Sequence, residues 1–205
     1  MTQREHWEKV YLSNPTDRVG WYKPHLVTSL KWIQELSLDK GANIIDVGGG
    51  ASTLVDDFLA DGYSSLTVLD LSQAALALTK KRLSERASSV TWLEGDITSV
   101  DLPACRYDLW HDRAVFHFLI TPDQRQRYVA NLLKALKPGG HVIIGTFSLE
   151  APPKCSGLPV ERYSAVKLER VLGSEFLLKK RDQELHVTPG GVEQMYLYCH
   201  FQRTA

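Results

Sequence analysis

Short apolar runs rich in β-forming residues alternate with amphipathic segments along most of the chain. The clearest runs lie at 43–47, 65–69, 90–93, 107–110 and 141–147. Strands separated by helical segments usually lie parallel in one sheet, because each crossover helix returns the chain to the edge that it left. The alternation therefore predicts an α/β fold built on a mostly parallel sheet, with helices on both faces.

The segments before and between these runs have the periodicity of amphipathic helices. Apolar residues recur at helical spacing in 24–36, 72–87 and 124–136. Ser72 is a suitable N-cap for the second of these helices. The Lys-Pro-Gly-Gly turn at 137–140 is expected to end the third.

The last quarter of the chain departs from this alternation. A loop rich in proline and small residues covers 150–160, and a helix is predicted at 164–172. Two further extended runs, 176–187 and 191–201, are separated by a Thr-Pro-Gly-Gly turn sequence. Together with the five earlier runs, they predict a seven-stranded sheet that finishes in an antiparallel pair.

Composition argues against several classes of protein. The formal net charge is zero, so nothing in the charge suggests a nucleic-acid partner. The three cysteines, Cys105, Cys155 and Cys199, contain no C-x-x-C pair, which argues against a disulfide framework or structural zinc. No apolar run approaches the roughly 18 residues of a membrane span, and the first residues lack a signal-peptide core. We therefore expect a soluble cytoplasmic protein without a membrane partner.

Three glycines, Gly48, Gly49 and Gly50, directly follow the first predicted strand. Glycine lets a ligand approach the backbone closely, which is typical of nucleotide sites at strand-to-helix turns. NAD and flavin sites share this feature, but Ser52 stands where their third glycine is expected. Asp46, which is next to the loop, would repel a pyrophosphate and tolerate ammonium and sulfonium charges. These residues favour S-adenosylmethionine (SAM) as the cofactor.

Two further acids end the next two predicted strands. Asp70 is expected to accept hydrogen bonds from both ribose hydroxyls, with Leu71 beside it. Asp96 is expected to accept from the adenine amino group while Ile97 packs on the ring. Either acid alone would suit an ordinary turn after a strand. Because the carboxyl ends of parallel strands share one sheet edge, the acids together indicate a SAM site.

With these motifs, residues 40–147 resemble the class I SAM-dependent methyltransferase family. The sequence Leu-Lys-Pro-Gly-Gly-His-Val-Ile-Ile at 136–144 is also similar to the family's pattern before its fifth strand. The resemblance implies a Rossmann-like seven-stranded sheet with an antiparallel C-terminal strand. It also implies an enzyme that transfers a methyl group from SAM.

The length of the chain suits a single methyltransferase domain at 1–205. We expect residues 1–38 to form an N-terminal arm and helix that can act as a lid. Residues 39–147 are the expected SAM-binding core. Residues 148–205 are expected to supply a substrate loop, a helix and a C-terminal β-hairpin.

The segment after the fourth predicted strand is dense in titratable and aromatic residues. Ligands of open α/β sheets bind beyond the carboxyl ends of the strands, so residues 108–118 should meet the acceptor. The Asp-Arg-Ala run at 112–114 is similar to the corresponding stretch of thiopurine and related thiol or chalcogen methyltransferases, which implies a small acceptor. Arg113 and His117 are four residues apart and would share a helix face, where they could stabilise an anionic nucleophile. His111 is a candidate base.

Each of these residues also has a purely structural interpretation. Arg113 could form a local ion pair with Asp112, and His117, between two phenylalanines, could be a core residue. A metal site at His111, Asp112 and His117 is not expected, because positions six apart point to different sides of a helix. We therefore predict no metal cofactor.

Further candidates for the acceptor pocket lie in the N-terminal arm and near the loop at 150–160. Cys155 follows Lys154, whose charge would lower the pKa of the thiol. The aromatic candidates are Tyr11, Trp21, Tyr22 and Tyr163, although aromatic residues more often simply pack. His186 lies near the predicted hairpin turn and is assigned no role.

Three functions fit this sequence. The first is methyl transfer from SAM to a small nucleophile such as a thiol or chalcogen compound. The alternative is a protein lysine methyltransferase, with a protein docked on the N-terminal arm. The third is a SAM-binding protein without catalysis. An Asn-Pro-Pro-Tyr or Asp-Pro-Pro-Tyr signature does not follow the fourth predicted strand, which argues against methylation of DNA bases or glutamine.

Overall fold

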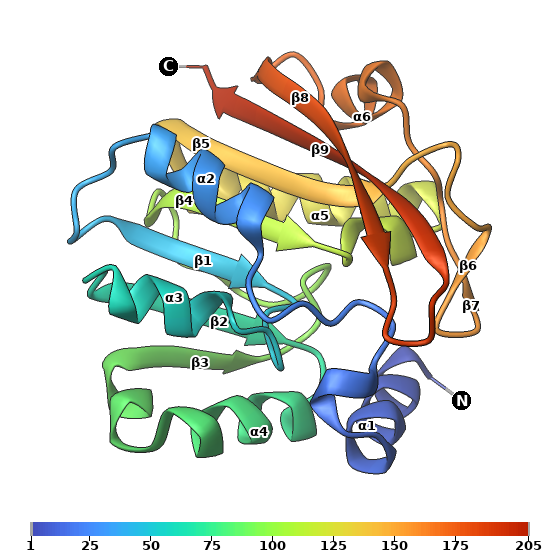
Figure 1. Cartoon of the computed structure of the whole chain (residues 1–205). Helices are drawn as coiled ribbons and strands as arrows, with labels where there is room; N and C mark the ends of the chain where they lie inside the picture. Colours follow the sequence, from blue (N-terminus) through green and yellow to red (C-terminus); the bar gives the residue numbers. More distant parts are fainter. Residues whose placement is uncertain (1, 205) are drawn as a thin grey trace.

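A seven-stranded sheet in the order β3-β2-β1-β4-β5-β9-β8 forms the centre of the molecule (Figure 1). The computed structural model describes residues 2–204. Strand β9 runs antiparallel to both of its neighbours, while β1 to β5 are parallel, which confirms the predicted Rossmann-like α/β fold. The strands are β1 (Asn43–Val47), β2 (Ser65–Asp70), β3 (Val90–Glu94), β4 (Tyr107–Arg113), β5 (Leu136–Phe147), β8 (Phe176–Val187) and β9 (Glu193–Arg203).

Helices cover both faces of this sheet, as predicted. Helices α2, α3 and α4 pack on one face, and α5 and α6 pack on the other. The helices are α1 (Gln3–Ser13), α2 (Val27–Glu35), α3 (Leu54–Ala60), α4 (Gln73–Leu83), α5 (Pro122–Ala135) and α6 (Ala165–Leu172), with short 3₁₀ helices η1 (Thr16–Arg18), η2 (Ser84–Ser89) and η3 (Phe116–Phe118). Among the described residues, no helix is both long and apolar enough to cross a membrane.

Side-chain caps fix where several helices begin. Ser72 accepts a hydrogen bond from the backbone of Ala75, which confirms it as the N-cap of α4. Thr121 and Gln124 form a capping box at α5, which has proline in its first turn. Thr2 and Glu5 form another at α1, so much of the predicted N-terminal arm is a helix.

Two strands are longer than the sequence predicted, and one predicted loop contains a small hairpin. Strand β5 begins at Leu136, the last residue of the predicted helix, and runs through the expected turn, because Leu136 already pairs with Tyr107. Strand β4 continues to Arg113, which pairs with Gly145 of β5. The 150–160 loop contains the paired segments β6 (Lys154–Cys155) and β7 (Leu158–Pro159).

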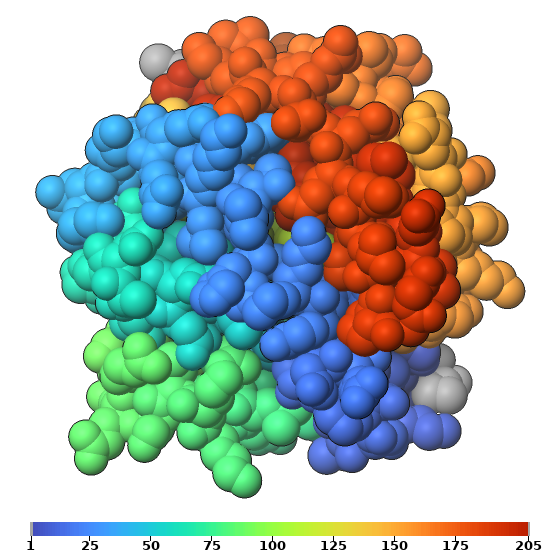
Figure 2. Space-filling view, viewed as in Figure 1, coloured from blue at the N-terminus to red at the C-terminus, as the bar shows by residue number. Residues whose placement is uncertain are grey.

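The N-terminal segment crosses the carboxyl ends of the parallel strands. In Figure 2 its blue surface lies between the C-terminal hairpin, in red, and the green surface of α4 and its surroundings. Glu8 of α1 holds this arrangement by accepting hydrogen bonds from the Ser72 hydroxyl at 2.6 Å and the Ala74 backbone at 3.1 Å. The ligand-binding edge of the sheet is therefore covered by the first residues of the chain.

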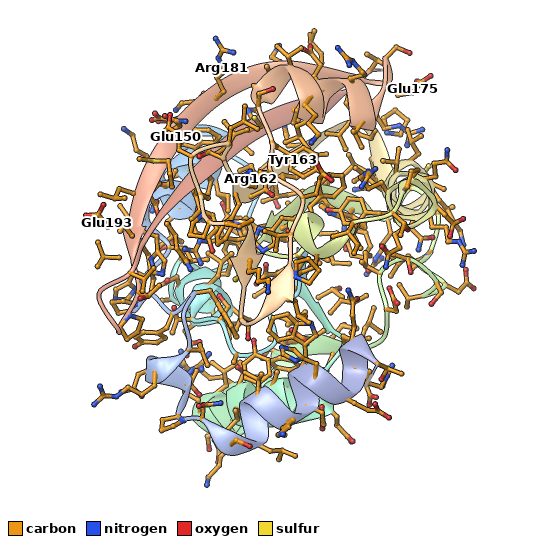
Figure 3. All side chains as sticks on the ribbon, turned by 90° about the vertical axis from the view of Figure 1, so that its right-hand side faces the viewer. Glu150, Arg162, Tyr163, Glu175, Arg181 and Glu193 are labelled. Atoms are coloured by element: carbon orange, nitrogen blue, oxygen red, sulfur yellow. The ribbon has the colours of Figure 1, made fainter. Side chains whose placement is uncertain are left out.

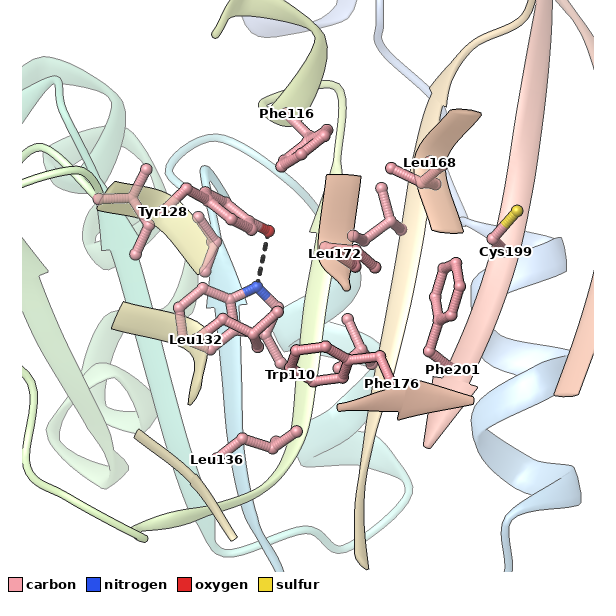
Figure 4. Close-up of a cluster of buried hydrophobic side chains, with 14 of the residues drawn as sticks. Trp110, Phe116, Tyr128, Leu132, Leu136, Leu168, Leu172, Phe176, Cys199 and Phe201 are labelled. Carbon is pink, nitrogen blue, oxygen red and sulfur yellow. Dashed lines mark hydrogen bonds between the residues drawn. The ribbon is translucent and has the colours of Figure 1, made fainter. Parts of the chain in front are cut away.

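A dense apolar core between the sheet and helices α5 and α6 supports this edge (Figure 4). The Trp110 indole donates to the Tyr128 hydroxyl at 2.8 Å, and the two rings pack edge to face. Leu168 of α6 is fully buried in the same core. Shortening its side chain would therefore leave a cavity that the neighbouring side chains cannot readily fill.

Replacing Leu168 by alanine should lower the free energy of unfolding by about 2–5 kcal/mol, because it leaves a cavity in a packed core. The measurement is urea denaturation followed by circular dichroism. Val166→Ala on the same helix is the matched control, because Val166 is 58% exposed; its effect should stay within about 0.5 kcal/mol. Equal effects of the two changes would contradict the assigned packing of α6.

Candidate active site

The glycine loop after β1 is held against two buried carboxylates. A Cβ at Gly49 would overlap the carboxylate of Asp46, and one at Gly50 would overlap that of Asp70. Gly48 has a positive φ of 71°, which glycine adopts at little cost. Gly49 and Gly50 are therefore required for the close packing of Asp46 and Asp70 on the loop, whether or not a ligand also approaches it.

Asp70 receives two backbone hydrogen bonds across this loop. Gly50 donates to Oδ2 at 2.9 Å and Ser72 donates to Oδ1 at 2.8 Å. Burial raises the pKa of Asp70 to about 6, although these N–H groups oppose the shift. Each carboxylate oxygen can accept a further hydrogen bond, so Asp70 remains able to bind two hydroxyls.

A cavity lies beyond Asp70. The predicted adenosine residues Leu71, Asp96 and Ile97 line it together with Asp70. Asp96 also holds its own turn by accepting from the backbone and hydroxyl of Thr98, at 2.8 and 2.7 Å. The predicted adenosine residues thus lie around one space at the sheet edge. The other lining residues are Gln3, Trp7, Tyr11, Trp21, Val47, Gly48, Leu69, Gly95, Arg113, Ala114, Val115, Phe118, Leu119 and Cys155.

A second cavity adjoins the first and borders the glycine loop. The two share Tyr11, Trp21, Gly48 and Arg113 as lining residues. The second cavity is also lined by Asp46, Gly49, Ser52, Tyr22, Lys23 and His111, among others. Both charge signs are present, because Asp46 lies here with Lys23 and Arg113.

His111 is occupied on both ring nitrogens, which argues against its predicted role as a base. Its Nδ1 lies 2.7 Å from Oδ1 of Asp46, and its Nε2 lies 2.8 Å from the Ser29 hydroxyl. The other oxygen of Asp46, Oδ2, is buried and has no hydrogen-bond partner among residues 2–204. Oδ2 of Asp46 is therefore a free acceptor at this edge.

Arg113 reaches both cavities from the end of β4. It donates to the Tyr198 hydroxyl at 3.0 Å and to the Trp21 carbonyl at 2.9 Å, and its guanidinium lies 4.5 Å from the centre of the Tyr196 ring. Its Nη2 has no hydrogen-bond partner within the described part of the chain. The alternative ion pair with Asp112 does not form. Asp112 instead accepts from the Tyr128 hydroxyl at 2.8 Å and from two backbone N–H groups.

The prediction that Arg113 and His117 share a helix face is wrong. Arg113 ends a strand, Ala114 follows with a positive φ of 68°, and His117 lies in the short helix η3. His117 is fully buried beside Phe118 and Phe147, and its Nδ1 accepts from the Phe147 backbone at 3.3 Å. Burial, together with Arg113, lowers the pKa of His117 to about 3. His117 lines neither cavity and is neutral, which supports its core interpretation.

The β6–β7 hairpin brings Cys155 to the first cavity. Figure 3 shows this hairpin between the long β8–β9 hairpin and α1. Burial raises the pKa of the Cys155 thiol to about 12, so the expected lowering by Lys154 is wrong. Tyr163, also expected in the pocket, lines neither cavity and packs at 5.4 Å from Phe116 in the core.

Side chains of the C-terminal hairpin, β8–β9, hold residues 20–23 of the N-terminal segment over the second cavity. His186 hydrogen bonds the Gly20 carbonyl at 2.7 Å, which gives a structural role to a histidine that the sequence left unassigned. Glu184 pairs with Lys23 at 2.6 Å. Trp7 and Trp21 pack edge to face at 5.3 Å on the first cavity. Trp7 was missed because nothing in its neighbourhood distinguished it from other aromatic residues of the arm.

A family model described as a methyltransferase domain matches residues 44–140. This stretch contains the glycine loop and the acids that line the two cavities. Residues 44–140 are therefore a SAM-dependent methyltransferase domain.

The name of one curated relative of this methyltransferase states a protein substrate, and the name of another states none. The chain is 23% identical to the eEF1A lysine and N-terminal methyltransferase of Bos taurus, over 83% of this chain and 29% of that protein. It is 31% identical to Nodulation protein S of Rhizobium tropici, over 54% of this chain and 46% of the relative. The chain therefore spans less than half the length of these two relatives.

Solved structures share the fold of the methyltransferase. One, from work on the conversion of a disulfide bond into a thioacetal group during echinomycin biosynthesis, has a TM-score of 0.79 at 19% identity, over 99% of this chain and 92% of the other. Another is the 1,6-didemethyltoxoflavin-N1-methyltransferase of Burkholderia thailandensis with bound S-adenosylhomocysteine. Its TM-score is 0.69 at 20% identity, over 98% and 84% of the two chains.

SAM is the cofactor of the methyltransferase, and its chemistry fits the polar groups at the cavities. The unpartnered Oδ2 of Asp46 suits an ammonium group. Arg113, whose Nη2 has no hydrogen-bond partner among the described residues, lines the same cavity and suits a carboxylate. Asp70 has acceptor capacity left for hydroxyls. The residues present therefore match the amino-acid and ribose parts of the cofactor.

The affinity for S-adenosylhomocysteine should fall as the pH is lowered through about 6, the pKa of Asp70. Ribose hydroxyls donate to the ionised carboxylate, so the complex binds fewer protons than the free protein and binding strengthens as pH rises. Calorimetric titration between pH 5 and 8 measures this change.

Asp70→Asn should weaken binding at pH 8 by about tenfold and flatten the pH dependence. Asp112→Asn is the matched control, because burial also raises the pKa of Asp112 to about 6, although Asp112 lines neither cavity. A pH dependence that survives in Asp70→Asn and vanishes in Asp112→Asn would refute the ribose role of Asp70.

Proposed function

We propose that this methyltransferase transfers the methyl group of SAM to a small nucleophile, of which a thiol or chalcogen compound is the best candidate. The observation that carries the proposal is the covered cavity that includes Arg113. Trp7, Tyr11 and Trp21 of the N-terminal segment line this cavity, and Phe118 packs against Trp7 at 4.9 Å. A site enclosed in this way suits a small acceptor and excludes water from the reaction.

In the proposed site, Asp46 accepts from the ammonium of the cofactor and Asp70 accepts from its ribose. Asp96 accepts from the adenine amino group, and Leu71 and Ile97 pack beside the adenosine. The glycine loop at 48–50 and Ser52 border the amino-acid part. The lining of the two cavities and the unpartnered Oδ2 of Asp46 support this arrangement.

SAM supplies an electrophilic methyl group on a positively charged sulfur. The protein then has to hold the acceptor in line and exclude water, because the charge disperses during transfer. Arg113 stays protonated in its buried position and would favour the thiolate of an acceptor whose ordinary pKa is near 8.5. Cys155 is kept as a neutral thiol by burial and therefore acts as part of the wall.

Protein lysine methylation remains the second candidate, supported by the name of the Bos taurus relative. A lysine side chain would have to enter beneath the N-terminal segment. It would also meet Arg113, whose charge repels an ammonium group. A SAM-binding role without catalysis is the third candidate, which only an activity assay separates from the first.

Transfer of radiolabelled methyl groups tests these candidates directly. The protein is incubated with labelled SAM and, separately, with small thiols, reduced selenium and tellurium compounds, or lysate proteins. Label in a small thiol or chalcogen compound supports the proposal. Label only in protein would replace it with the lysine function. No transfer to any acceptor, although the protein binds S-adenosylhomocysteine, would indicate the non-catalytic function.

Arg113→Met should lower turnover of a thiol acceptor by roughly 10- to 100-fold, because it removes the cation that favours the thiolate. The rise of activity with pH should also move to higher pH, toward the ordinary thiol pKa. Stopped-assay rates between pH 6 and 10 measure both effects. His117→Phe is the control, because His117 is neutral and buried: its pH profile should match that of the unmodified protein. A lower rate with an unchanged profile in Arg113→Met would refute the role of its charge.

The three cysteines also support the proposed cytoplasmic location. Cys105, Cys155 and Cys199 are all free thiols, and the last two are buried. Free thiols persist in the reducing cytoplasm.

A further inference from the structure

Three buried side chains from three different elements form a continuous hydrogen-bonded chain behind the glycine loop. The Ser29 hydroxyl of α2 lies 2.8 Å from Nε2 of His111 on β4, and Nδ1 of His111 lies 2.7 Å from Oδ1 of Asp46 on β1. The exposed fractions of Ser29, His111 and Asp46 are 0%, 1% and 3%. Water therefore has no access with which to replace these contacts.

The chemistry of the groups gives this chain one direction. An ionised carboxylate only accepts hydrogen bonds, so Nδ1 of His111 carries the proton that points to Asp46. The other nitrogen of a neutral imidazole is then an acceptor, and the Ser29 hydroxyl donates to it. Ser29 thus selects the tautomer in which His111 can hold Asp46.

Arg113 is held in place by a separate buried contact. The Tyr198 hydroxyl accepts from Nε of Arg113 at 3.0 Å. Asp46 and Arg113 both line the second cavity. The two opposite charges that face this cavity are therefore each fixed by a buried polar partner.

The carboxylate of Asp46 is fixed on both sides. His111 holds Oδ1, while the carboxylate packs so closely on Gly49 that a Cβ there would overlap Oδ2. Oδ2 is buried without a partner among residues 2–204, which is costly unless a ligand supplies a donor. The carboxylate cannot turn to satisfy this oxygen without breaking its bond to His111.

We infer that Ser29 and His111 are positioning residues for the cofactor, which act by holding Oδ2 of Asp46 toward the ammonium group of its amino-acid part. The inference rests on the proposed role of Asp46. It gives His111 a function that needs no proton transfer to or from the acceptor. It also assigns a function to Ser29, which itself lines neither cavity.

Two ligands that differ only at the amino-acid end test the inference. S-adenosylhomocysteine carries the ammonium, whereas 5′-methylthioadenosine keeps the adenosine and the thioether but lacks the amino-acid part. Calorimetry gives both dissociation constants for each variant of the full chain. His111→Leu should weaken S-adenosylhomocysteine by about tenfold, as expected for a lost hydrogen bond to a charged group, and change 5′-methylthioadenosine by less than about twofold.

His111→Asn is the matched control, because its amide nitrogen lies near the place of Nδ1 and can still donate to Asp46. It should restore most of the affinity that His111→Leu loses. Ser29→Ala should weaken S-adenosylhomocysteine selectively by about threefold, because it removes the group that fixes the tautomer. If His111→Leu does not fold, Ser29→Ala decides by the same comparison of ligands.

Asp46→Asn separates failure of the inference from failure of the proposed role of Asp46. Selective loss of S-adenosylhomocysteine binding in Asp46→Asn, with none in His111→Leu and Ser29→Ala, would overturn the positioning role alone. Equal loss for both ligands in His111→Leu and Ser29→Ala would reduce these residues to structural supports and also overturn it. An unchanged preference in Asp46→Asn would overturn the proposed role of Asp46, and the inference with it.

Discussion

Close packing of two carboxylates against the glycine loop is the constraint on which the site depends. Asp46 and Asp70 are buried at the ends of adjacent strands, where an uncompensated charge would be expensive. Loop N–H groups compensate Asp70, and His111 compensates Asp46. The backbone can come this close only because Gly49 and Gly50 have no side chain. The same contacts therefore shape the loop and hold the acids at the cavities.

The fold could be predicted because its signals are local. Alternating strands and helices, the Ser72 cap and the turns at glycine each follow from a few neighbouring residues. The cofactor residues could be predicted for a related reason: once β1, β2 and β3 are parallel, the acids at their ends must share one edge. The full extents of β4 and β5 could not, because they depend on pairing between distant residues such as Arg113 and Gly145.

The predicted chemistry of the residues after β4 failed where burial decides the outcome. A spacing of four residues predicted one helix face for Arg113 and His117, but strand pairing took Arg113 into the sheet. Lys154 is exposed while Cys155 is buried, so desolvation governs the thiol. Ser29 had no sequence signal, since a serine in an amphipathic helix is ordinary. Its contact with His111 exists only in the folded chain.

The hydrogen bond from Arg113 to the Trp21 carbonyl connects the N-terminal segment to the interior of the site. A backbone carbonyl is an acceptor that no substitution at position 21 removes, so evolution can vary the tryptophan and keep the tether. Any displacement of the N-terminal segment would break this hydrogen bond and leave the guanidinium with one partner fewer. Release of one product and entry of the next acceptor would then both change the contacts of Arg113. A substitution that altered the rate of this exchange of product for acceptor would therefore also alter the charge environment of the reaction.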